Sequence, residues 1–147
     1  MKRTILICSC LFVALFTQAQ LPWNVSFGGK TILQTRGTDE TANRVRIKTS
    51  QLSSSRNLVL SYRMPADEKD WKRTLLIDDS NNAGVLSDPP ELKRGKLTAS
   101  FTISGKKLKE LLTKYRVLKF RFASIPSDPK KAMLVRMSPI HICTIYL

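Results

Sequence analysis

Residues 96–122 read KLTASFTISGKKLKELLTKYRVLKFRF, and the spacing of apolar residues changes twice along this stretch. Apolar and polar residues alternate over 96–103, which is the period of a strand with one buried face. The apolar residues of this part are Leu97, Ala99, Phe101 and Ile103. Over 105–115 the spacing becomes helical, with apolar residues at i, i+3, i+4 and i+7. These residues are Leu108, Leu111, Leu112 and Tyr115.

Alternation returns from Val117 to Phe122, where Phe120 and Phe122 oppose Lys119 and Arg121. Ser104 precedes the helical part and is a suitable N-cap, because its hydroxyl can accept a bond from a free backbone N–H of the first turn. The stretch therefore predicts a strand, a short amphipathic helix and a second strand.

The rest of the chain predicts further short strands, separated by turn signals at the spacing typical of β-sandwiches and barrels. The predicted strands are 23–27, 30–34, 44–48, 57–64, 71–77, 132–137 and 140–147. The 44–48 segment alternates Val45 and Ile47 with basic residues, which predicts a half-buried strand with a solvated cationic face. We expect a mainly β fold: an antiparallel β-sandwich, jelly-roll or immunoglobulin-like, with about eight strands and one short helix near 105–115.

The first residues have the three-part layout of a secretory signal peptide. Met1–Arg3 is basic, an almost unbroken apolar run extends to Phe16, and the small residue Ala19 follows. The apolar run is shorter than the ~20 residues that a membrane-spanning helix needs. An uncleaved membrane anchor and lipidation of Cys10 are the alternatives.

Cleavage is expected after Ala19 or Gln20. Residues 1–19 are then a signal peptide, and residues 20–147 form a single β-sandwich domain. We expect export to the periplasm, the extracellular space or the cell surface, with no transmembrane segment left after cleavage. The processed chain retains one cysteine, Cys143, so it cannot form an internal disulfide.

The composition is strongly basic and poor in metal-binding residues. The 147 residues include 25 Lys and Arg against 11 Asp and Glu, a formal net charge of +14, with three Cys and one His. These counts exclude a Cys/His zinc module and a disulfide framework, and the length excludes a multidomain enzyme.

His141 and Cys143 are two residues apart, so a regular strand would place both on one face. A thiolate beside an imidazole is the basis of cysteine nucleophile chemistry. No third group is evident that would orient the imidazole, and the same face continues with Ile145 and Leu147. We therefore interpret this segment as a packed core face.

Oxygen-rich residues cluster at Asp78–Gly84, which reads DDSNNAG. An EF-hand alignment fails because Ala83 and Pro90 fall where a calcium loop needs oxygen ligands. The composition is that of an ordinary turn. A looser cation site and a carboxylate pair for glycoside hydrolysis are the alternatives; the residues available are Asp67, Glu68, Asp70, Asp78 and Asp79. We expect no catalytic residue, no metal site and no cofactor.

Positive charge is concentrated in one third of the chain. Residues 92–136 contain 13 basic and 2 acidic residues, whereas residues 20–91 contain 10 and 9. The helical part and the strand after it supply most of this excess, and we predict a binding surface there. Its residues are Lys106, Lys107, Lys109, Lys114, Arg116, Lys119 and Arg121.

A cationic surface attracts anions, so the expected partner is an anionic glycan, a lipid head group or an acidic protein. Nucleic acid is disfavoured by the export signal and because Phe120 and Phe122 face away from the basic residues. We therefore expect an exported, non-catalytic binding module. The alternatives are an assembly protein that uses sheet edges or an apolar patch, and a small enzyme or enzyme inhibitor. The oligomeric state is not predicted.

Overall fold

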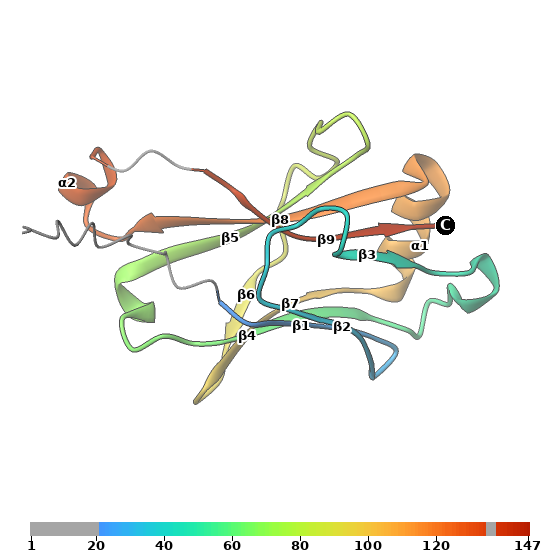
Figure 1. Cartoon of the computed structure of the whole chain (residues 1–147), viewed down its shortest axis with the longest axis horizontal. Helices are drawn as coiled ribbons and strands as arrows, with labels where there is room; N and C mark the ends of the chain where they lie inside the picture. The colour runs from blue at the N-terminus through green and yellow to red at the C-terminus, as the bar shows by residue number, and fades with distance from the viewer. Residues whose placement is uncertain (1–20, 135–137) are drawn as a thin grey trace, which may run out of the picture.

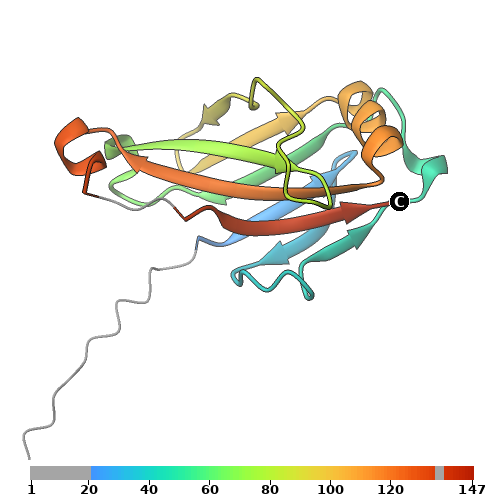
Figure 2. The same ribbon diagram turned by 90° about the horizontal axis from the view of Figure 1, so that it is seen from above.

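Two β-sheets pack face to face as a sandwich in the computed structural model, which describes residues 21–134 and 138–147 (Figures 1 and 2). The mainly β sandwich predicted from the sequence is confirmed, with five strands in one sheet and four in the other. The predicted signal peptide, residues 1–19, lies outside the described residues.

The five-stranded sheet is antiparallel throughout. In spatial order its strands are β2 (Lys30–Thr35), β1 (Trp23–Phe27), β4 (Leu58–Arg63), β7 (Thr98–Ile103) and β6 (Leu92–Arg94). Every second residue of β1, β4 and β7 is buried against the other sheet, which explains the alternating sequences of these strands.

The four-stranded sheet contains one parallel strand pair. In spatial order its strands are β3 (Arg44–Arg46), β9 (Ile140–Tyr146), β8 (Val117–Pro126) and β5 (Trp71–Asp78). The pair β3–β9 is parallel, and the other two pairs are antiparallel. Two short 3₁₀ helices adjoin strands of this sheet along the chain: η1 (Thr49–Gln51) follows β3, and η2 (Glu68–Asp70) precedes β5.

The two α-helices lie at opposite ends of the sandwich. Helix α1 (Gly105–Tyr115) connects β7 to β8 across one end, and α2 (Pro129–Ala132) follows β8 at the other (Figure 1). The helix predicted near 105–115 is therefore confirmed. No helix in the described part of the chain is long and apolar enough to cross a membrane.

Aromatic rings from both sheets meet in the middle of the sandwich. Phe122 of the four-stranded sheet packs edge-on against Trp23, Tyr62 and Phe101 of the five-stranded sheet, with centroid distances of 4.8, 5.4 and 6.2 Å. Edge-to-face contacts of this kind favour a defined alignment of the sheets. The three buried leucines of α1 extend this core to one end of the sandwich; they are Leu108, Leu111 and Leu112.

The strand predicted over 132–137 is wrong over the residues that the structure describes. Ala132 ends α2, and Met133 and Leu134 form a turn. The local chemistry favours the helix, because Asp128 accepts a bond from the backbone N–H of Lys130 at 2.9 Å and a proline occupies the first turn. Residues 135–137 lie outside the described part of the chain.

The hairpin of β6 and β7 also differs from the prediction. Leu97 lies in the turn with 68% of its surface exposed, rather than facing the core with Ala99. The backbone N–H of Gly95 donates to the carbonyl of Thr98 at 2.7 Å and closes this turn. Strand β6 was not predicted, because three residues are too few to show a period.

Candidate binding surface

Helix α1 is fixed at its N-terminus by a close approach to the segment before β4. The hydroxyl of Ser104 accepts a bond from the backbone N–H of Lys107 at 3.3 Å, as the N-cap prediction required. The side chain of Asn57 accepts a bond from the backbone N–H of Gly105 at 3.0 Å. A Cβ on Gly105 would lie 2.2 Å from the carbonyl oxygen of Ser53, so only glycine fits there.

The basic side chains of α1 lie on the surface that its buried leucines leave free. Lys106, Lys109 and Lys114 are exposed, and Arg116 is the exposed C-cap. Within the described residues, none of these four forms an ion pair. Lys107 differs, because it pairs with Glu110 at 3.4 Å.

Lys119 and Arg121 occupy the outer face of the four-stranded sheet, and both are already bonded. The Nζ of Lys119 donates to the side chain of Asn82 at 2.8 Å. The guanidinium of Arg121 pairs with the carboxylate of Asp78, which is buried. These two cations are therefore engaged with the Asp78–Asn82 turn, unlike the exposed cations of α1.

The parallel pairing of β3 with β9 adds arginines that the predicted binding surface did not include. Arg44 pairs with Thr144 of β9, and Thr144 pairs with Lys119 of β8, so all three share the outer face. The next residue on this face of β3, Arg46, pairs with Tyr146. The end of β3 lies at the α1 end of the sandwich in both views (Figures 1 and 2).

The structure therefore divides the seven predicted residues into three sets: four cations of α1 and its C-cap that form no ion pair with a described residue, one paired lysine of α1, and two cations of the sheet face. Arg46 lies at the α1 end of the outer sheet face, because its partner Tyr146 also pairs with Val117, the residue after Arg116. We call the four cations of the first set, together with Arg46, the α1 surface; it comprises Lys106, Lys109, Lys114, Arg116 and Arg46. Lys119 and Arg121 belong to the sheet face, and Lys107 is paired on α1. The basic strand predicted over 44–48 was the signal for Arg46, but a parallel long-range pairing cannot be inferred from local spacing.

His141 and Cys143 lie on opposite faces of β9, contrary to the prediction. The pairing of β9 with β8 skips Ile142, so His141 pairs with Arg121 and Cys143 pairs with Phe120. This β-bulge moves His141 to the outer face, where its Nε2 lies 2.9 Å from the hydroxyl of Thr144.

Cys143 remains in the core, and burial raises the pKa of its thiol well above the usual range. A buried thiol without a nearby base is a weak nucleophile. The predicted packed core face is thus confirmed for Cys143 and wrong for His141. Burial lowers the pKa of His141, and the nearby cations Lys119 and Arg121 act in the same direction.

The predicted turn at Asp78–Gly84 is confirmed. The carboxylate of Asp79 accepts bonds from the backbone N–H groups of Asn81 and Ala83 at 2.8 and 3.0 Å. Asn82 adopts a positive φ of 63°, which asparagine tolerates in turns. Among residues 21–134 and 138–147, no group of three or more His, Cys, Asp or Glu is arranged to hold a metal ion.

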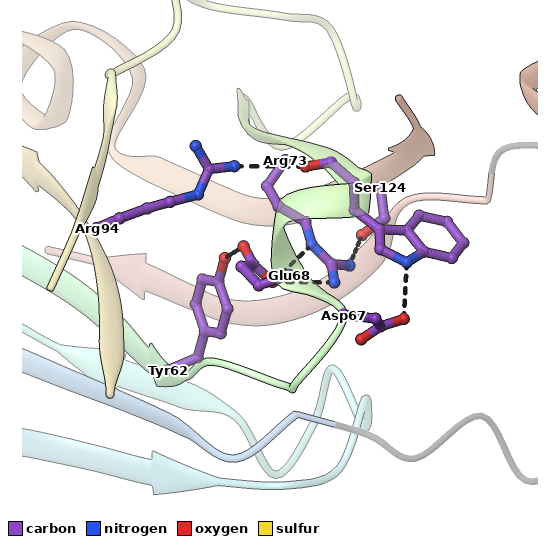
Figure 3. Close-up of polar contacts among 7 residues, drawn as sticks. Tyr62, Asp67, Glu68, Arg73, Arg94 and Ser124 are labelled. Atoms are coloured by element: carbon purple, nitrogen blue, oxygen red, sulfur yellow. Dashed lines mark hydrogen bonds and ion pairs between the residues drawn. The ribbon is translucent and has the colours of Figure 1, made fainter. Parts of the chain in front are cut away.

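Glu68, a buried carboxylate of the candidate acidic loops, is engaged in a structural network (Figure 3). It pairs with Arg73 of β5 at 3.0 Å and accepts a bond from the hydroxyl of Tyr62. Arg73 also donates to the hydroxyl of Ser124 at 2.6 Å. The network joins β4 of one sheet to β5 and β8 of the other, so its role is to hold the two sheets together.

Asp67, in contrast, accepts a bond from the indole N–H of Trp71 at 2.9 Å. One open depression lies between β1 and the end of β2; its residues are Pro22, Trp23, Asn24, Gln34, Thr35 and Arg36. No carboxylate lines this depression.

Comparisons with protein-family models, with curated proteins and with solved structures gave no significant match.

Proposed function

We propose that the protein is an exported, non-catalytic binding module that holds an anionic glycan on the α1 surface. This proposal rests on one observation. Exposed cations gather at one end of the sandwich, and none of them has an acidic partner among the described residues. These cations are Lys106, Lys109, Lys114, Arg116 and Arg46.

The chemistry of these residues favours a polyanion over a single small anion. Lysine carries a compact point charge and three rotatable donors, whereas bidentate recognition of one phosphate or carboxylate uses arginine. Charges within about a Debye length of one another, ~8 Å at physiological salt, act together on an extended chain of sulfate or phosphate groups. Such a surface also raises the association rate.

A soluble partner suits the α1 surface better than a lipid bilayer does. The leucines of α1 pack into the core, since Leu108, Leu111 and Leu112 are all buried. An amphipathic helix on a membrane needs its apolar face free for the interface. Only the polar and charged face of α1 is available to a partner.

The test compares the heparin affinity of the wild type with that of two variants, heparin serving as a model polyanion. Both variants change the net charge by the same amount. Lys106→Glu/Lys109→Glu/Lys114→Glu reverses the α1 surface, and Lys69→Glu/Lys93→Glu/Lys96→Glu reverses exposed lysines away from α1. We expect the first variant to bind at least ten-fold more weakly at physiological salt and the second to bind within about three-fold of the wild type.

Equal weakening by the two variants would show that only net charge matters, and would refute a defined surface. Binding that persists unchanged at high salt would favour the alternative, an assembly protein whose contacts are apolar. Thermal unfolding serves as the folding check, because exposed substitutions usually change stability by less than about 0.5 kcal/mol.

A further inference from the structure

The end of the sandwich opposite α1 carries two adjacent exposed apolar side chains. Met133 and Leu134 are 83% and 87% exposed, and in the described part of the chain the other large apolar residue of this kind is Leu97. They follow α2, which projects past the end of β8 in both views (Figures 1 and 2). We call residues 129–134 the α2 tip.

The backbone of the α2 tip is held in place by hydrogen bonds. The N–H groups of Met133 and Leu134 donate to the carbonyls of Pro129 and Lys131 at 3.2 and 3.1 Å. Just before the tip, the N–H of Ser127 donates to the carbonyl of Asp70 at 2.7 Å. The two apolar side chains are therefore presented outward from a formed turn.

Cations flank these apolar side chains. Lys130 and Lys131 are exposed, and neither forms an ion pair with a described residue. The adjacent carboxylate of Asp128 is engaged, since it accepts a bond from the backbone N–H of Lys130. Apolar and cationic side chains are thus both exposed on the α2 tip.

We propose that the α2 tip docks the protein on an anionic lipid bilayer. Met133 and Leu134 enter the interface between head groups and acyl chains, and Lys130 and Lys131 contact the lipid phosphates. A bilayer offers a continuous apolar layer beneath a layer of negative charge, which matches a projecting tip that carries both kinds of side chain. The α1 surface then lies at the end away from the membrane.

The test is sedimentation with vesicles of phosphatidylglycerol and phosphatidylcholine in a one-to-three ratio, at physiological salt. Met133→Ser/Leu134→Ser keeps every charge and is expected to bind at least ten-fold more weakly than the wild type. Lys130→Gln/Lys131→Gln is expected to lose about five-fold per lysine, equivalent to about 1 kcal/mol each. Leu97→Ser is the matched control and should bind within two-fold of the wild type.

Absence of wild-type binding, unchanged binding by Met133→Ser/Leu134→Ser, or an equal loss in Leu97→Ser would each overturn the proposal. A concentration-dependent dimer that the tip variant abolishes, with no vesicle binding, would assign the tip to self-association and also overturn it. Heparin binding by the tip variant separates this proposal from the function proposed above: it should equal that of the wild type, because the α1 surface is intact.

Discussion

The carboxylate of Glu68 and the guanidinium of Arg73 form an ion pair whose two side chains are only 6% and 9% exposed. The Oε2 of Glu68 lies 3.0 Å from Nη2 and 3.1 Å from Nε of Arg73. Burial and the bond to Glu68 raise the pKa of Tyr62, so its hydroxyl stays protonated and donates to the same carboxylate (Figure 3). The pair fixes the loop between β4 and β5 against both sheets.

Replacement of Glu68 by glutamine should destabilise the fold strongly. The change leaves the buried guanidinium of Arg73 without its counter-charge, and breaking a buried pair in this way costs about 3–5 kcal/mol. Urea unfolding measures the effect. Glu110→Gln is the control, because it removes the exposed pair with Lys107 and should cost less than about 1 kcal/mol. Similar losses in both variants would contradict a structural role for the Glu68 network.

Gly105→Ala should destabilise the docking of α1. The added Cβ would lie 2.2 Å from the carbonyl oxygen of Ser53 and 2.6 Å from that of Arg56, and backbone atoms cannot move aside easily. We expect a loss of about 1–3 kcal/mol in the free energy of unfolding. Gly37→Ala is the control, since no atom lies within 4 Å of its added Cβ. A Gly105→Ala protein as stable as the Gly37→Ala protein would refute this close approach.

The fold was predictable wherever one face of an element is buried and the other is solvated. Strands such as β7 and β8 and the helix α1 show their periods directly in the sequence. The errors fall where another rule acts: the Asp128–Pro129 cap favours α2 over a strand, and the bulge at Ile142 moves His141 to the outer face of β9. A bulge depends on pairing with a distant strand, so local alternation does not reveal it.

The residues of the proposed binding surface were predictable in part for a related reason. Charge is visible in the sequence, so the lysines of α1 could be named, but their partners could not. The pairs of Arg121 with Asp78 and of Lys119 with Asn82 join segments about 40 residues apart, as does much of a β-sandwich. The position of β3 beside β9 is equally non-local.

Stability should fall as the pH drops below the usual pKa of histidine, near 6.5. Burial, Lys119 and Arg121 lower the pKa of His141, and Glu40 and Asp39 offset this only in part. The unfolded chain therefore binds a proton more readily than the folded chain, and acid favours unfolding. His141 is the only histidine in the chain, so it is the one side chain with its usual pKa in this range.

Unfolding free energies measured from pH 7.5 down to pH 5.5 test this prediction. The wild type should lose stability over that range, and His141→Gln should lose less. The variant shares every other titrating group, so the difference between the two slopes reports His141 alone. Parallel slopes would mean that His141 takes up its proton without cost in the folded protein.

Arg116→Gly should stabilise the protein while removing a charge from the α1 surface. Arg116 is the C-cap of α1 and has a φ of 65°, in the left-handed region that a side chain disfavours. Its backbone N–H donates to Leu112 and its carbonyl accepts from Leu147, so the conformation is held by bonds that glycine can keep. Relief of the strain should raise the free energy of unfolding by about 1 kcal/mol.

Arg116→Ala is the matched variant, because it removes the same charge and retains a Cβ at the strained position. Its free energy of unfolding should remain within about 0.5 kcal/mol of the wild type. If the α1 surface binds heparin as proposed, both variants should weaken that binding equally despite their different stabilities. A glycine variant less stable than the alanine variant would contradict the prediction that the backbone of Arg116 is strained. Unequal heparin binding by the two variants would show that the backbone conformation at the C-cap affects binding as well as the charge.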